Sequence, residues 1–229
     1  MNEVVGLLAD ASASEDLDAT RTRAAVLAVA KAVFARGGRI LVHGDSPTVA
    51  LLTAVALEYR LVQPVETVER RVAPLVVVGG LRTGAVEDRL FSREQNGVDD
   101  DLGELERFGV IETTTAPLEG TLGEAYERYS PVAVFLLGRG ERLGRAAEGA
   151  FSHHQRTRTP LYATADVPWT ADWNRIDSQP STDDLKPTLD GRSLRGEDAE
   201  VAARADSDAR VAVAIETIID RLIPDTRRR

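Results

Sequence analysis

Four short stretches of the chain combine small and polar residues where an apolar run gives way to a helical pattern. The clearest reads VHGDSPTVALLTAV, residues 42–55, in which Ser46 can cap a helix and Pro47 suits its first turn. Such junctions often bind phosphate in α/β proteins, because helix N-termini present free N–H groups and a dipole that favours anions. The four junctions are residues 10–14, 44–48, 79–84 and 138–144. Together they predict a crevice for a nucleotide-like ligand.

The candidate ligand-binding residues are those at the junctions whose backbone or side chain could reach such a ligand. Glycine lets a ligand approach the backbone closely, hydroxyls can donate to phosphate, and arginine can hold phosphate with two parallel hydrogen bonds. Turn formation and helix capping are the competing structural roles for the glycines and hydroxyls. The candidates are Ser12, Ser14, Gly44, Asp45, Ser46, Thr48, Gly79, Gly80, Arg82, Gly138, Arg139, Gly140 and Arg142.

Other motifs with known chemistry are absent or incomplete. Residues 138–144 read GRGERLG, which is one residue longer than the GxGxxG dinucleotide fingerprint and follows a late strand instead of the first. No Walker A motif and no cysteine occur in the chain. The adjacent His153 and His154 would face different ways on a helix, so they predict no metal pair. We therefore expect neither a bound metal nor a resident cofactor.

Composition narrows the classes of partner. The chain has 229 residues, is 43% hydrophobic and carries a formal charge of −9. It is long enough to bury a core, and its acidic surface would repel nucleic acid and anionic membranes. No segment approaches the roughly 20 apolar residues that span a bilayer, and the N-terminus lacks the basic region of a secretion signal. We expect a cytoplasmic protein with a small-molecule partner.

Apolar runs alternate with helical patterns along the chain, and they define the elements that would position the junctions. The predicted strands are residues 4–9, 39–43, 75–78, 110–115, 132–137 and 160–163. Helices are predicted over residues 20–36, 46–59, 101–108 and 211–223. Two further helices are predicted, one that begins at residue 121 and one that follows residues 138–140 and ends near residue 155. Continuously apolar strands that alternate with helices predict an α/β, Rossmann-like fold, with a mostly parallel sheet and helices on both faces.

The predicted organisation is one domain followed by a C-terminal extension. Residues 1–166 contain all the predicted strands and form the Rossmann-like domain. Residues 167–229 begin with a loop-rich stretch of Asp, Ser, Pro and Gly with little periodicity, and end with an amphipathic closing helix. We expect this extension to pack on the same domain.

Four segments in this order resemble the SLOG superfamily, which includes the LOG-type nucleotide phosphoribohydrolases and the ligand-sensing domains of prokaryotic defence proteins. The segments are GLLADASAS (6–14), GGRILVHGDSPTVALL (37–52), GTLGEAYERYSPVAVFLLGRGE (120–141) and TPLYATAD (159–166). They are similar to the family's first strand with its Ser-rich loop, its second strand with a Gly-rich turn, its double-glycine loop and its last strand. The resemblance implies a Rossmann-like domain that binds a nucleotide or ADP-ribose-type molecule.

The catalytic motif of the LOG-type hydrolases is broken in this chain. That motif reads PGGxGTxxE, in which Gly and Thr hold phosphate and Glu helps to cleave the N-glycosidic bond. The matching stretch, residues 137–144, reads LGRGERLG and lacks the Pro, the adjacent second Gly and the Thr. The sensing members, which bind a nucleotide-derived signal without consuming it, fit better. We expect such a sensor in prokaryotic defence or stress signalling, with a homodimer as its candidate oligomeric state.

Two alternatives remain open at the level of the sequence. One is an enzyme that cleaves or transfers at the N-glycosidic bond of a nucleotide, with Glu141 or Glu148 as acid/base or nucleophile. The other is a degenerate fold whose acidic surface or C-terminal extension binds a protein partner.

Overall fold

The strands form one sheet in which every neighbouring pair is parallel. The computed structural model describes residues 3–9, 17–44, 48–62, 72–79, 98–114, 122–138, 144–163, 174–175 and 197–224. Within these residues the sheet has seven strands in the order β4-β3-β2-β1-β5-β6-β7. Their bounds are β1 Val4–Ala9, β2 Arg39–His43, β3 Leu75–Val78, β4 Ile111–Thr114, β5 Ala133–Leu137, β6 Leu161–Ala163 and β7 Asn174–Arg175. The predicted α/β, Rossmann-like class is confirmed.

The centre of the sheet is apolar because it is covered on both faces. Every residue of β1, β3 and β5 is buried, and β-branched and aliphatic side chains dominate these strands. Parallel sheets with helices on both faces require such continuous apolar runs. Gly6 is the exception within β1, where a Cβ would lie 3.1 Å from Cε1 of Tyr126, so the missing side chain lets that ring lie against the strand.

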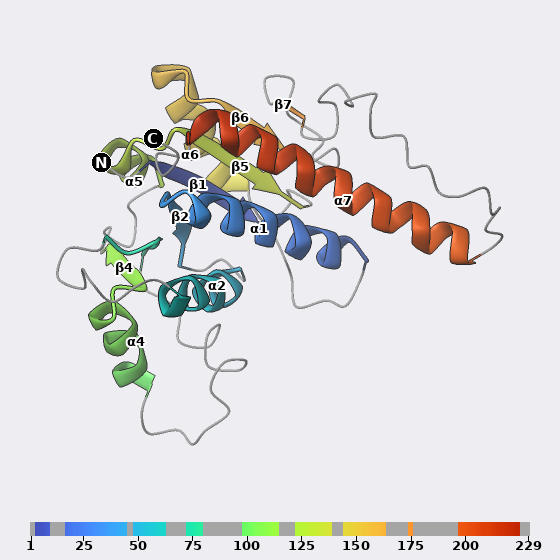
Figure 1. Ribbon diagram of the computed structural model, residues 1–229. Coiled ribbons are helices and arrows are strands. Elements are labelled where there is room, and N and C mark those ends of the chain that lie inside the picture. Colours follow the sequence, from blue (N-terminus) through green and yellow to red (C-terminus); the bar gives the residue numbers. More distant parts are fainter. Residues whose placement is uncertain are drawn as a thin grey trace.

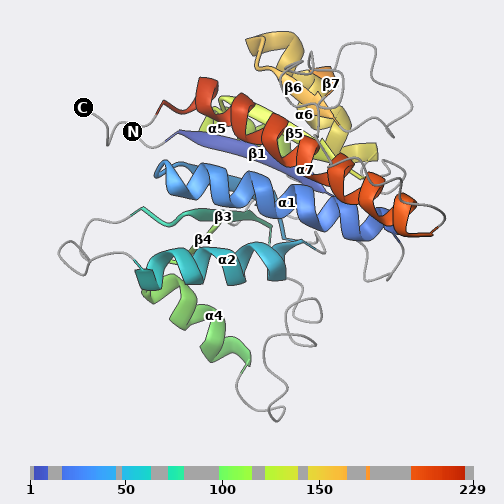
Figure 2. The ribbon, with the colours of Figure 1, turned by 45° about the vertical axis from the view of Figure 1, so that its right-hand side comes forward.

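Helices cover both faces of the sheet (Figure 1). The helices are α1 Leu17–Ala35, α2 Val49–Val62, α4 Val98–Arg107, α5 Leu122–Tyr129, α6 Gly144–Thr157 and α7 Glu197–Leu222. α1, α2 and α7 lie on one face, where Figure 2 shows them side by side, and α4 adds Leu105 to the apolar cluster there. The other face packs against α5 and α6, through Ala125, Tyr126 and Ala150. We refer to these as the α1 face and the α5 face.

The closing helix packs against α1. Ile215, Ile218, Ile219 and Ile223 belong to the apolar cluster of the α1 face, and Asp220 pairs with Arg36 at the end of α1. The α1 helix ends where the sequence predicts, because Gly37 adopts a φ of +73° that few side chains tolerate. None of the described helices combines the length and the apolar character needed to cross a bilayer.

The extension differs from the sequence prediction in two places. The last helix begins at Glu197, well before the predicted residue 211. Its first turns contain alanines and charged residues, which favour a helix without giving it an apolar stripe. β7 was not predicted either, because a two-residue strand is too short to show a period.

Candidate functional site

The order of the strands reverses direction between β1 and β5. The chain moves outward from β1 through β2 and β3 to β4, then returns to the other side of β1 with β5 and continues to β6. The helices that follow β1 and β5 lie on opposite faces, since α1 packs in one apolar cluster and α6 in the other. In open parallel sheets, ligands bind beyond the carboxyl ends of the strands at such a reversal.

Three predicted glycines follow three different strands and therefore lie along one edge of the sheet. Gly44 follows β2, and its N–H donates to the carbonyl of Val78 at 2.8 Å. Gly79 follows β3 with a φ of +80°, and its N–H donates to the carbonyl of Thr114 at 3.1 Å. Gly138 follows β5 with a φ of +98°. The strands are parallel, so all three corners belong to the carboxyl edge.

Thr48 is the fourth predicted residue that the structure describes. It is fully buried, and its carbonyl accepts the N–H of Leu52 at 2.9 Å, which begins the first turn of α2. Thr48 therefore helps to fix the corner that follows Gly44. The candidates that lie outside the described residues are Ser12, Ser14, Asp45, Ser46, Gly80, Arg82, Arg139, Gly140, Glu141 and Arg142. Glu148 lies in α6, and its side chain is outside the described part.

His43 is an edge residue that the sequence prediction did not select. It is the last residue of β2 and is partly exposed. A Cβ at Gly79 would lie 3.9 Å from Nε2 of His43, so the imidazole reaches toward the corner after β3. The signal in the sequence was the polar end of the apolar strand RILVH, which precedes the predicted corner.

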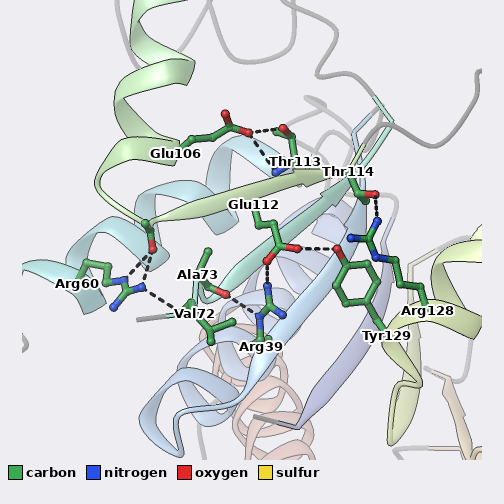
Figure 3. A network of polar contacts seen from close by, with 11 residues as sticks. Arg39, Arg60, Val72, Ala73, Glu106, Glu112, Thr113, Thr114, Arg128 and Tyr129 are labelled. Carbon is green, nitrogen blue, oxygen red and sulfur yellow. Dashed lines mark hydrogen bonds and ion pairs between the residues drawn. The ribbon is translucent and has the colours of Figure 1, made fainter. Parts of the chain in front are cut away.

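A network of polar side chains ties β2 and β4 to α5 on the α5 face (Figure 3). Arg39 pairs with Glu112 and donates from Nε to the carbonyl of Ala73 at 2.8 Å. The hydroxyl of Tyr129 donates to the second carboxylate oxygen of Glu112 at 2.7 Å. Burial alone would raise the pKa of Glu112, but the hydrogen bond from Tyr129 and the charge of Arg39 outweigh it and hold this pKa below its usual value. Glu112 is thus a stable carboxylate with its partners in place.

Arginines elsewhere in the same region also have partners. Arg60 closes the end of α2, because its guanidinium donates to the carbonyl of Gly109 at 2.9 and 2.7 Å and to that of Val72 at 3.0 Å. Arg156 of α6 pairs with Glu127 of α5 at the surface. These contacts join secondary-structure elements, and we assign them a structural role.

Arg128 differs from these arginines. Its Nη1 donates to the hydroxyl of Thr114 at 3.4 Å, a long hydrogen bond, and its guanidinium lies 5.4 Å from the ring centroid of Tyr129. Within the described part of the chain no carboxylate forms an ion pair with it. Figure 3 shows its guanidinium directed toward Thr114, the last residue of β4. Arg128 therefore places a positive charge near the carboxyl edge.

The α5 face also buries two ionisable rings between α5 and α6. Tyr126 and His153 have ring centroids 5.4 Å apart, and both residues are almost entirely buried. Burial raises the pKa of the Tyr126 hydroxyl well above its usual value. Burial, together with the nearby charge of Arg156, lowers the pKa of His153 despite the opposing charge of Glu127. Both rings are therefore neutral at pH 7, and the described residues contain no cluster of three metal-ligating side chains.

Comparison of the chain with models of protein families, with curated proteins and with solved structures finds no match.

Proposed function

We propose that this protein binds a nucleotide-derived small molecule, of the nucleotide or ADP-ribose type, along the carboxyl edge of its sheet. The observation that carries the proposal is the convergence of Gly44, Gly79 and Gly138 on that edge of a parallel sheet, on both sides of the point where the strand order reverses. Because these corners have no Cβ, a phosphate can approach the backbone closely there.

A sensor that does not consume its ligand is favoured over an enzyme. The sequence resembles the SLOG superfamily, and the hydrolytic motif of its LOG-type members is broken here in the stretch LGRGERLG, which fits the sensing members better. Two titratable side chains lie near α5. Glu112 is a carboxylate paired with Arg39, and His153 is a buried neutral imidazole. Neither lies at the carboxyl edge, where it could act as a general acid or base on a ligand.

Thermal-shift screening against nucleoside monophosphates, nucleoside diphosphates and ADP-ribose isomers tests the proposal. A ligand that binds only the folded state raises Tm by an amount that grows with its concentration over Kd. We expect such a shift for at least one compound, without release of free base. Release of free base would identify the N-glycosidic hydrolase instead, and silence across the panel would contradict the proposal.

A matched pair of glycine variants localises the binding. Gly138→Ala and Gly37→Ala each force a side chain into a positive φ, so each should lower the Tm of the free protein. Only Gly138 lies at the carboxyl edge, because Gly37 ends α1 before β2 begins. We expect Gly138→Ala to abolish the ligand-induced shift and Gly37→Ala to retain it. Equal ligand-induced shifts in the two variants would place the ligand elsewhere.

A further inference from the structure

We propose that His153 is a pH-sensitive latch: the neutral imidazole holds α6 against α5 and the start of β6, and a proton on Nδ1 releases α6. The inference does not depend on the proposed ligand, because His153 lies near the end of α6, beside the residue that precedes β6, and not at the carboxyl edge. It rests on the donors and acceptors around the ring, which determine where the neutral imidazole carries its single proton.

Two threonine hydroxyls determine which nitrogen of His153 is protonated. Thr157 Oγ1 donates its only hydrogen to the carbonyl of His153 at 2.8 Å. It must therefore accept from Thr159 Oγ1, which lies 2.8 Å away, so the single hydrogen of Thr159 is also used. Thr159 Oγ1 lies 3.3 Å from Nε2 of His153 and can only accept there. We therefore assign the neutral ring as the Nε2–H tautomer, in which Nδ1 carries the lone pair.

The lone pair of Nδ1 lies in a place that suits a neutral nitrogen and not a charged one. Nδ1 is buried and accepts no hydrogen bond within the described part of the chain. The ring beside the imidazole is that of Tyr126 on α5, with centroids 5.4 Å apart, and its hydroxyl is likewise buried and unpaired among those residues. A proton on Nδ1 would bury a positive charge without a hydrogen-bond acceptor, which costs far more than a buried lone pair.

The charges around His153 would not compensate that proton. The strands contribute only aliphatic side chains to the apolar cluster of the α5 face, as far as the structure describes it. Arg39, which is also buried on this face, is paired with Glu112. The charges that act on the imidazole are Arg156 of α6 and Glu127 of α5, which pair with each other at the surface. Protonation therefore favours a state in which the ring reaches water.

The helix that a charged His153 would release is α6. Ala150 and His153 are the only side chains of α6 that the structure describes as buried. The imidazole is the larger of these two anchors, whereas α7 is held by Ile215, Ile218 and Ile219. Segments with few buried apolar contacts open at a lower free energy than the whole protein. Acid should therefore open α6 locally, before the chain unfolds.

Nuclear magnetic resonance of the full chain tests the tautomer. At pH 7.5, nitrogen–proton correlation spectra of the imidazole should show the proton of His153 on Nε2 and none on Nδ1. Thr159→Val removes the acceptor hydroxyl, so the Nδ1–H tautomer should become populated in that variant. A proton on Nδ1 in the wild type, or an unchanged tautomer in Thr159→Val, would overturn the assignment and the latch with it.

Amide hydrogen exchange at pH 7.5 and 5.5, corrected for the intrinsic exchange rate, tests the release. Burial and Arg156 lower the pKa of His153 below 6.5 in the closed state, and an opened ring regains the ordinary value. Opening of α6 should therefore increase roughly threefold or more as pH falls below 6.5, while the amides of α7 keep their protection. Unchanged exchange in α6, or an equal loss of protection in α6 and α7, would overturn the proposal.

Two histidine variants identify the group that takes up the proton. His153→Gln should make the opening of α6 independent of pH over this range. His154→Gln removes the adjacent imidazole on the same helix and should retain the dependence of the wild type. A dependence that persists in His153→Gln, or that is lost in His154→Gln, would contradict the latch. The wild-type titration needs no substitution, so it decides the question even where His153→Gln does not fold.

Discussion

The two faces of the sheet bury different kinds of side chain. The α1 face is filled largely by aliphatic residues from α1, α2 and α7, and its closing contacts are isoleucines. The α5 face also buries the polar side chains of Arg39, Tyr126 and His153. Removing such groups from water costs free energy unless hydrogen bonds compensate for the lost hydration. The α1 face therefore acts as scaffold, whereas the α5 face buries polar groups, of which Arg39 begins β2 and His153 contacts Thr159 just before β6. This difference directs the expected effects of substitutions.

The scaffold face should give the largest loss of stability. Ile219 of α7 is fully buried against the α1 face, so Ile219→Ala should lower the free energy of unfolding by about 2–5 kcal/mol. Val213, which is 45% exposed on the same helix, provides the control, and Val213→Ala should cost less than about 1 kcal/mol. Urea denaturation measures both values. Similar small losses in the two variants would mean that α7 does not complete the core.

Adding a side chain at Gly6, on the α5 face, should give the second-largest loss of stability. In Gly6→Ala the new Cβ would meet Tyr126 Cε1 and Val134 Cγ2 at 3.1 Å, and the misfit should cost about 1–3 kcal/mol. In Gly103→Ala, within α4, nothing lies within 4 Å of the new Cβ, so that variant should gain about 0.4–1 kcal/mol. Thermal unfolding should show a lower Tm for Gly6→Ala and a higher Tm for Gly103→Ala. A higher Tm in Gly6→Ala would contradict the packing of Tyr126 on β1.

The network around Glu112 should make the free energy of unfolding depend on pH in the acidic range. The pKa of Glu112 is lower in the folded protein than its ordinary value of 4.5, so the folded state binds fewer protons than the unfolded state near that pH. Its contribution is present above pH 4.5 and is lost as pH falls through the lowered value. Glu112 is partly exposed, so we expect about 1 kcal/mol at pH 7, removed in Glu112→Gln. Parallel stability curves for wild type and variant between pH 3 and 6 would refute this role.

His153 should give the smallest and most local dependence on pH. Burial and the charge of Arg156 lower its pKa below 6.5 in the folded state, so the unfolded state binds the proton more readily. Stability should therefore be highest above pH 6.5 and decrease as pH falls from 6.5 toward the lowered pKa. His153→Leu should remove this part of the slope. Chemical denaturation at pH 5.5 and 7.5 measures the difference, and an unchanged slope in the variant would contradict the buried neutral imidazole.

Much of the fold follows from local patterns in the sequence. The apolar runs of β1, β3 and β5 and the glycine stop after α1 have strong periodic or turn signals, and the structure confirms them. The start of α7 was predicted too late, because alanine and charged residues favour a helix without an apolar stripe. Local patterns therefore identify buried elements better than exposed ones.

The candidate site is less accessible from the sequence, because it depends on register between distant strands. The corners at Gly44, Gly79 and Gly138 could be predicted from strand–helix junctions alone. The contact between Arg128 and Thr114 could not, since it depends on the placement of α5 beside β4.

The central claim, a nucleotide-type ligand on the carboxyl edge, is tested most directly by mapping backbone amide shifts during titration with ADP-ribose and with nucleoside diphosphates. For the compound that binds, the account predicts saturable shifts at Gly44, Gly79 and Gly138. It predicts no change at Gly103 and Gly109, which lie within and just after α4. Shifts confined to α4 and its surroundings, or no saturable shift with any compound, would contradict it.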